Sequence, residues 1–194
     1  MTEKNQRIIV GISGASGAVY GIRLLESLRA LGVETHLIVS KSAEMTLAYE
    51  TDLTAKDLRA LADKSYPAGD MGAACSSGSF KTAGMIVAPC SMKSLAEIAT
   101  GVTSTLLTRA ADVVLKERRR LVLMVRETPL TNVHLRNMLT VSEMGGIIAP
   151  PVPGFYTKPE SIDDLVDHSV GRVLDLFGLD TGRVARWRET DTKS

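Results

Sequence analysis

Short apolar runs that alternate with helix-like segments constrain the fold of this chain more than any other feature. The runs cover residues 8–12, 33–39, 84–88, 121–125 and 146–149. The first, IIVGI, is β-branched and lacks polar alternation, which is typical of a strand that is buried on both faces. Strands of this kind that alternate with helices form parallel sheets. We therefore expect an α/β fold with a doubly wound, mostly parallel sheet and helices on both faces, of the Rossmann or flavodoxin-like class.

Helical periodicity fills the segments between the apolar runs. A chain of 194 residues is long enough for one substantial core and short for two. The sequence therefore predicts a single domain over residues 1–194, and we expect its tail, residues 178–194, to contact a neighbouring subunit. Residues 65–80 are rich in Gly, Ser and Ala and are predicted to be mostly loop, whereas the predicted helices are residues 20–31, 43–49, 54–63, 91–99, 106–119, 132–144 and 161–177.

The charge balance and the cysteine content exclude several classes of protein. Lys and Arg number 23 against 22 Asp and Glu, so no basic field is available for a nucleic acid or a membrane surface. No run approaches the ~20 apolar residues of a membrane span, and no signal peptide is visible. The two cysteines make no disulfide framework and the three histidines have no metal-like spacing, so we expect a cytoplasmic protein without a metal site.

The loop after the first predicted strand carries the sequence GISGASG at residues 11–17. Ligands of open α/β sheets bind beyond the carboxyl ends of the strands. Small residues there let backbone N–H groups approach an anion, and the helix that follows adds unpaired N–H groups. The spacing is neither that of a dinucleotide-binding loop nor that of a nucleotide P-loop. By itself the turn is equally consistent with phosphate binding and with a tight connection that binds nothing.

Three further loops at the same predicted edge carry polar side chains. They offer Ser40 after the second strand, PCSMKS at residues 89–94 after the third, and RETP at residues 126–129 after the fourth. Each serine taken separately is explained as a helix N-cap. Their coincidence at one sheet edge favours a ligand, and a flat heterocycle with one phosphate suits such an edge better than a long dinucleotide does.

Other candidate residues have simple structural explanations in the sequence alone. Arg109 and Lys116 lie seven residues apart on nearly one helix face, and cations near a helix end complement its dipole. Glu50 and Asp52 suit a surface cap. Cys90 follows a buried strand with no histidine nearby, so we expect a buried and inert thiol.

Six strings of the sequence occur together in one known family. They are GISGASGA at residues 11–18, ETD at 50–52, PCSMKS at 89–94, RAADVVLKER at 109–118, RETPL at 126–130 and PGFY at 153–156. In these strings, and from about residue 8 to residue 187, the chain resembles the UbiX-like flavin prenyltransferases. The resemblance implies an enzyme that transfers a dimethylallyl group from dimethylallyl phosphate to N5 and C6 of reduced FMN, without a metal. It also implies a dodecamer with active sites at subunit interfaces. The product, prenylated FMN, would serve a UbiD-type decarboxylase in ubiquinone biosynthesis or in aromatic-acid decarboxylation.

The resemblance further implies which residues form the site. FMN would be held by Gly14, Ala15, Ser16, Ser40, Ser91, Met92, Lys93, Ser94 and Arg126. Dimethylallyl phosphate would be held by Tyr156, Arg172, Lys116, Arg109 and Trp187. The catalytic residues would be Ser16, Glu50, Lys116 and Glu127. The cations would stabilise the departing phosphate, whereas Ser16, Glu50, Glu127 and the retained phosphate all remain candidates for the proton transfers.

One departure from the family and two alternative functions accompany this interpretation. Arg120 stands where relatives have Pro, just before the fourth strand, where we expect it only to alter a turn. The PCS sequence at residues 89–91 also resembles flavin-dependent cysteine decarboxylases, but the chain has no Pro-x-Met-Asn substrate clamp. A flavin carrier, or a structural subunit of a decarboxylase complex, is the non-enzymatic alternative.

Overall fold

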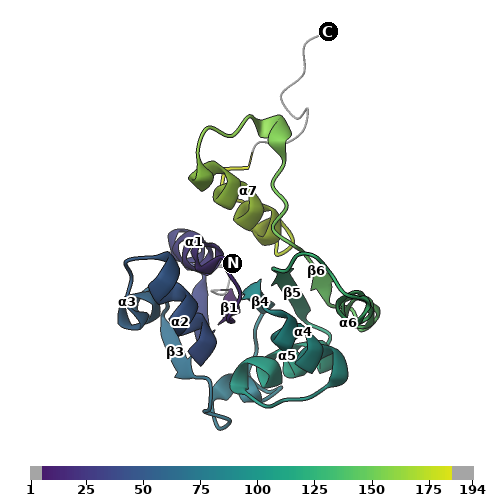
Figure 1. The fold of residues 1–194 in the computed structure, drawn as a ribbon. Helices are drawn as coiled ribbons and strands as arrows, with labels where there is room; N and C mark the ends of the chain where they lie inside the picture. Colours follow the sequence, from purple (N-terminus) through teal and green to yellow (C-terminus); the bar gives the residue numbers. More distant parts are fainter. Residues whose placement is uncertain (1–5, 185–194) are drawn as a thin grey trace.

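The computed structural model describes residues 6–184 as a parallel sheet between two layers of helices (Figure 1). All five neighbouring pairs of strands are parallel, in the order β3-β2-β1-β4-β5-β6. The strand order reverses at β1, so the switch point of the sheet lies between β1 and β4. This architecture confirms the predicted fold class. The strands are β1 (Arg7–Ile12), β2 (Glu34–Val39), β3 (Lys64–Pro67), β4 (Gly84–Cys90), β5 (Arg120–Val125) and β6 (Ile147–Ile148).

The two faces of the sheet carry different helices, and alternate residues of the central strands belong to two separate cores. In β4, Ile86 and Ala88 pack with the core of α1 and α7, whereas Met85 and Val87 pack with the core of α5. Figure 1 shows α1 and α7 on one side of the strands and α4 and α5 on the other. The first face carries α1 (Ala18–Ala30), α2 (Lys41–Glu50), α3 (Ala55–Ala60) and α7 (Ile162–Asp175), and the second carries α4 (Met92–Thr100), α5 (Leu106–Lys116) and α6 (Asn132–Glu143).

One strand, β3, overlaps the start of the segment that was predicted to be mostly loop. β3 forms the edge of the sheet, and its side chains are exposed or half-buried, so no apolar run marks it in the sequence. The predicted helix at residues 54–63 is also shorter, since α3 ends at Ala60. Two short 3-10 helices, η1 (Ala74–Ser76) and η2 (Phe155–Thr157), complete the described chain. Within residues 6–184, no helix has the length and apolar character needed to cross a membrane.

Arg120 does more than alter a turn. It is the first residue of β5, and its guanidinium carbon lies 5.5 Å from the centre of the Phe177 ring, just beyond α7. The cation therefore helps to hold the end of α7 against the amino end of the sheet, opposite the edge where the predicted site lies.

Candidate functional site

The loops that follow β1 and β4 are tied together at the switch point of the sheet. The hydroxyl of Ser13 donates to the carbonyl oxygen of Pro89 at 3.0 Å and accepts from the N–H of Ser91 at 2.7 Å. Ser13 is buried, so these bonds are shielded from water. The turn at residues 14–17 and the start of α4 thus have a fixed relative position. The sequence does not reveal this bridge, because the partners of Ser13 lie more than 70 residues away along the chain.

Close packing explains one glycine of the turn at residues 11–17, and backbone conformation explains another. A Cβ added to Gly14 would lie 2.3 Å from Oγ of Ser42, in the first turn of α2. Gly17 has a φ of 106°, in the left-handed region that side chains disfavour. The turn therefore lies directly against the beginning of α2, which places Ser40 beside it.

The carboxylate of Glu50 lies at the N-terminus of α1. It accepts hydrogen bonds from the N–H of Gly17 at 2.9 and 3.1 Å, from the N–H of Ala18 at 2.8 Å, and from the side chain of Ser16. Desolvation raises the pKa of Glu50, but these bonds and the charge of Arg126 outweigh it and bring the pKa below its ordinary value of 4.5. The anion at this helix end is therefore the protein's own carboxylate.

Some N–H groups of the turn nevertheless remain available. Those of Gly14 and Ser16 make no hydrogen bond to any group within residues 6–184, whereas that of Ala15 donates to Ser13 at 2.9 Å. The turn thus presents unpaired backbone N–H donors beside the hydrogen-bonded side chains of Ser16 and Glu50, so it is more than a loop that binds phosphate.

Ser40 and Ser91 are the N-caps of α2 and α4. Each hydroxyl accepts from the backbone N–H three residues later, at 3.1 Å in α2 and 3.3 Å in α4. The N-cap explanation is therefore confirmed for both serines. The caps leave donors open, because the N–H groups of Met92 and Lys93 have no hydrogen-bond acceptor in the described part of the chain. Open amides at the positive end of a helix suit an anion or a carbonyl oxygen.

Arg126 brings a positive charge to the same edge of the sheet. Its N–H donates to the carbonyl oxygen of Cys90 at 3.1 Å. Burial raises the pKa of the Tyr20 phenol on α1, and the positive charge of Arg126 opposes that rise. Glu127, the next residue, is exposed and accepts from the N–H of Thr128 at 3.0 Å. One edge thus collects the predicted residues Gly14, Ala15, Ser16, Ser40, Glu50, Ser91, Met92, Lys93, Ser94, Arg126 and Glu127.

Tyr156 and Arg172 form a second group, on the face that carries α1 and α7. Arg172, on α7, lines a cavity of about 190 Å³ together with Met124 of β5. Its guanidinium donates to Asp175 at 2.7 Å. The hydroxyl oxygen of Tyr156, in η2, lies 3.4 Å from Nε2 of His168. His168 precedes Arg172 by about one turn of α7. The structure therefore brings Tyr156 and Arg172 together through His168, for which the sequence predicts no role.

Arg109 and Lys116 lie on α5, and each already has a partner within the protomer. Arg109 donates to the carbonyl oxygen of Ser76 at 3.2 Å and pairs with Asp112 at 2.7 Å. Lys116 pairs with Glu117 at 2.5 Å in the last turn of α5. Within one protomer both cations are therefore explained as ion-paired residues on the surface of α5. This agrees with the structural explanation that the sequence favoured.

The sheet separates Lys116 from Tyr156 and Arg172. The apolar side of α5 belongs to one core and that of α7 to the other, on opposite faces of the sheet. With a layer spacing of roughly 10 Å, the two helices are separated by about 20 Å. One protomer therefore does not bring Lys116 to the other two predicted phosphate ligands.

Two further predicted residues have different outcomes. Cys90 is completely buried, as predicted, and burial raises the pKa of its thiol to about 12, which disfavours the reactive thiolate at neutral pH. Trp187 lies outside the described residues.

Comparisons with known proteins agree on one family. The family model described as Flavoprotein matches residues 1–174. A flavin prenyltransferase UbiX of Neisseria meningitidis is 60% identical over 94% of this chain and 97% of its own. The crystal structure of AnUbiX (PadA1) in complex with FMN and dimethylallyl pyrophosphate is 58% identical, covers 95% of this chain and 98% of its own, and has a TM-score of 0.94. A dodecameric FMN-dependent UbiX-like decarboxylase from Escherichia coli O157:H7 is 54% identical over 94% of this chain and 99% of its own, with a TM-score of 0.92.

Proposed function

Since the chain belongs to the UbiX-like flavin prenyltransferases, we propose that it transfers a dimethylallyl group from dimethylallyl phosphate to N5 and C6 of reduced FMN. The observation that carries this proposal is the meeting of the turn at residues 11–17, the N-terminus of α4 and Arg126 at one switch point. A structure at 58% identity is a complex with FMN and dimethylallyl pyrophosphate. The product, prenylated FMN, is proposed to serve a UbiD-type decarboxylase.

The carboxyl edge of the sheet fits the polar groups of FMN. The open N–H groups at the turn and at the start of α4 can donate to carbonyl and phosphate oxygens, and Arg126 adds a positive charge. When it is bound and reduced, FMN supplies the nucleophilic positions that accept the dimethylallyl group. We assign its binding to Gly14, Ala15, Ser16, Ser40, Ser91, Met92, Lys93, Ser94 and Arg126.

Tyr156 and Arg172 are proposed to bind the phosphate of the donor. A guanidinium recognises phosphate through two parallel hydrogen bonds, and a tyrosine hydroxyl can donate a third. Lys116 and Arg109 would come to the same phosphate from a neighbouring subunit, because they lie on the other face of their own protomer. Together these cations would stabilise the negative charge that grows on the phosphate as the allylic bond breaks. Trp187 would complete this part of the site.

Ser16 and Glu50 are proposed to handle the proton that leaves the flavin when the second bond closes. The carboxylate of Glu50 is ionised at neutral pH and can accept a proton, and its lowered pKa makes it a weaker base than an ordinary glutamate. The hydrogen bond between them lets Ser16 relay the proton. Glu127, beside Arg126, is proposed as the second catalytic carboxylate.

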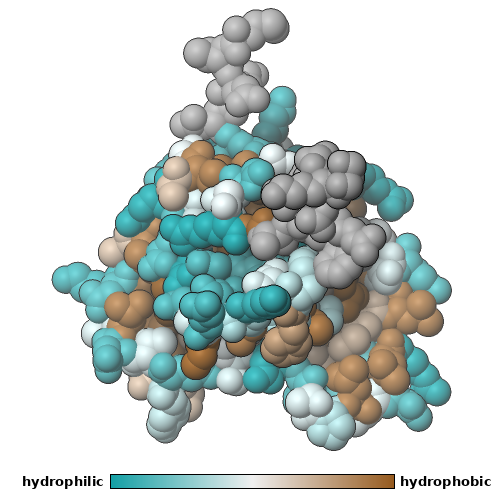
Figure 2. Space-filling model, turned by 90° about the horizontal axis from the view of Figure 1, so that it is seen from above, coloured by the Kyte–Doolittle hydropathy of each residue, from teal (hydrophilic) through white to brown (hydrophobic). Residues whose placement is uncertain are grey.

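We propose that the active assembly is a homo-oligomer, a dodecamer as in the relative from Escherichia coli O157:H7. A role for Lys116 at the same phosphate as Arg172 would need a neighbouring subunit, and the protomer exposes large apolar side chains that subunit contacts would cover. Tyr49, Phe155 and Ile162 are 88%, 74% and 77% exposed. Figure 2 shows that apolar side chains occur in several groups among hydrophilic ones on the face seen from above.

The chain is further proposed to act as one flavoprotein domain in the cytoplasm. Support for one domain comes from the single sheet that joins both cores within residues 6–184. Support for a reducing compartment comes from Cys75 and Cys90, which are both free thiols. Cell fractionation followed by immunodetection tests the location.

A mass spectrum of the flavin tests the proposed activity. The protein is incubated with reduced FMN and dimethylallyl phosphate under strictly anaerobic conditions, and the flavin is then extracted. We expect its mass to increase by one dimethylallyl group less the hydrogen that it replaces. Unmodified FMN would refute the prenyltransferase proposal, and release of carbon dioxide from a peptidyl-cysteine substrate would favour the decarboxylase alternative.

A further inference from the structure

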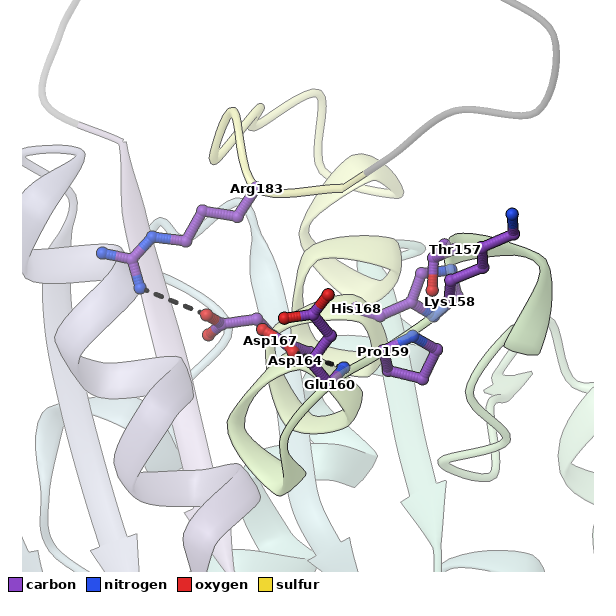
Figure 3. Close-up of a pocket in the computed structure, with 8 residues that line it drawn as sticks. All are labelled: Thr157, Lys158, Pro159, Glu160, Asp164, Asp167, His168 and Arg183. Atoms are coloured by element: carbon purple, nitrogen blue, oxygen red, sulfur yellow. Dashed lines mark hydrogen bonds and ion pairs between the residues drawn. The ribbon is translucent and has the colours of Figure 1, made fainter.

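His168 lies between two cavities on the α7 side of the molecule. It lines the cavity of about 190 Å³ that also contains Arg172, and the larger cavity of about 520 Å³ that Figure 3 shows. Its side chain comes from the middle of α7, and the residue is only 8% exposed. The role of this buried histidine therefore depends on the partners of its two ring nitrogens.

The backbone determines which nitrogen of His168 carries the proton. The N–H of Gly154 donates to Nδ1 at 3.3 Å, so Nδ1 must offer a lone pair. Burial lowers the pKa of His168 below 6.5, and the positive charge of Arg172 lowers it further, which favours the neutral ring at neutral pH. In a neutral ring that accepts at Nδ1, the single proton is on Nε2.

That proton points at Tyr156. The Nε2 atom lies 3.4 Å from the Tyr156 hydroxyl, and the two rings meet edge to face with their centres 5.9 Å apart. Nε2 is the donor in this contact, so the phenol oxygen accepts and the proton of the tyrosine is directed away from His168. The contact is long for a hydrogen bond, as is common in sites that tighten only when the substrate binds.

Gly154 makes this arrangement possible. A Cβ at this position would lie 2.5 Å from the ring of Tyr156 and 3.3 Å from the ring of His168. The glycine thus lets its own N–H reach the imidazole while the tyrosine packs over it. Its carbonyl oxygen accepts from the hydroxyl of Thr157 at 2.8 Å, which closes the loop around Tyr156.

We propose that His168 is a positioning residue that orients the Tyr156 hydroxyl toward the phosphate of the allylic donor. This inference rests on the proposed function, which assigns Tyr156 to that phosphate. His168 acts through the tyrosine and does not itself supply positive charge. Its effect therefore lies in donor binding, and the affinity for FMN should not depend on it.

A double-mutant cycle tests this role. The proteins are the wild type, His168→Leu, Tyr156→Phe and the double variant, and kcat and KM are measured for dimethylallyl phosphate at saturating reduced FMN. We expect His168→Leu to raise KM about fivefold to tenfold, as for one lost hydrogen bond, with a smaller change in kcat. In the Tyr156→Phe background the same substitution should change KM less than twofold, because the hydroxyl that it orients is absent.

Two more variants separate positioning from structure. The side-chain amide of His168→Gln can place a donor close to Nε2, so most of the KM should be restored. The matched control His134→Leu changes the histidine on α6, which contacts Thr131 and not Tyr156, and KM should stay at the wild-type value. The FMN dissociation constant of every variant is measured by fluorescence quenching and should be unchanged.

The possible failures are distinguishable. Equal losses from His168→Leu in both backgrounds, or no rescue by His168→Gln, overturn the positioning role while the wild-type activity stands. A wild-type protein that binds FMN but neither binds nor uses dimethylallyl phosphate refutes the proposed function, and the role of His168 with it.

Discussion

Mixed oligomers of two variants with low activity test whether Lys116 and Arg172 act on one phosphate from different subunits. Each substitution, Lys116→Ala or Arg172→Ala, removes a cation that is proposed to stabilise the departing phosphate and should lower kcat about 10²–10³-fold. In the protomer the two residues lie on helices at opposite faces of the sheet, α5 and α7. A complete site in a mixture therefore needs Lys116 from one kind of subunit and Arg172 from the other.

The expected recovery follows from this geometry. If subunits mix randomly in equal amounts, each required residue is present with a probability of one half, so about a quarter of the sites are complete. The variants are co-expressed with different affinity tags, purified through both tags and assayed for prenylated FMN. We expect about a quarter of the wild-type rate.

A matched pair controls for non-specific recovery. Tyr156 and Arg172 share one protomer, so oligomers that mix Tyr156→Phe with Arg172→Ala contain no subunit with both residues intact. Their activity should not exceed the average of the parents. A Lys116→Ala and Arg172→Ala mixture that recovers nothing refutes the two-subunit site.

Three further predictions concern the edge of the sheet that is proposed to bind FMN and the group of Tyr156, His168 and Arg172. Glu50→Gln keeps an acceptor for the α1 amides but loses the charge, so it should lower the free energy of unfolding by about 0.5–1 kcal/mol in urea titrations. It should also lose prenylation, and Ser16→Ala should do the same while retaining FMN; full activity in both would contradict the proton-transfer role. Gly14→Ala should destabilise the fold by about 1–3 kcal/mol because the added Cβ would clash with Ser42. Adding Ser42→Gly should restore part of the lost stability. A Gly14→Ala variant as stable as the wild type would show that the turn can move away from Ser42 at no cost. Because the pKa of His168 is lower in the folded protein, the unfolded chain binds a proton more readily at this residue. The contribution of neutral His168 to the free energy of unfolding is therefore complete above pH 6.5 and is lost as the pH falls through the lower folded pKa. Over this pH range, at fixed protein concentration, the urea midpoint of His168→Gln should fall less than that of the wild type. The same dependence of the midpoint on pH in both proteins would refute the neutral state of His168.

The sequence predicted most of the fold because the central strands are buried on both faces. All seven residues of β4 are buried, so the apolar pattern that results is unmistakable. β3 escaped prediction for the opposite reason, since it pairs with β2 alone and its side chains are exposed or half-buried. An edge strand of this kind is defined by its partner and carries little pattern of its own.

The candidate site was predictable where residues lie in post-strand loops. Ser40, Ser91 and Arg126 follow strands, and the carboxyl ends of parallel strands meet at one edge, so their positions follow from topology. The position of Lys116 relative to the site was harder to predict. Helical spacing places this residue on one face of α5 but does not show which face of the sheet α5 covers.

The structural roles of Ser13 and His168 could not be predicted from the sequence, because they depend on tertiary contacts. Ser13 bridges two loops that are distant in sequence, and the tautomer of His168 depends on the backbone of Gly154. A weak signal for the histidine does exist, since His168 lies four residues before Arg172 on the same helix and four residues place two side chains on one face. Placing Tyr156 beside it needs the fold of the loop that follows β6.

The stoichiometry of phosphate release against flavin modification tests the central claim most directly. Inorganic phosphate and modified flavin are counted in the same anaerobic reaction of dimethylallyl phosphate with reduced FMN. Group transfer at the proposed site predicts about one phosphate released for each flavin that gains a dimethylallyl group. Phosphate release without flavin modification, or neither product, would contradict the account of this protein as a flavin prenyltransferase.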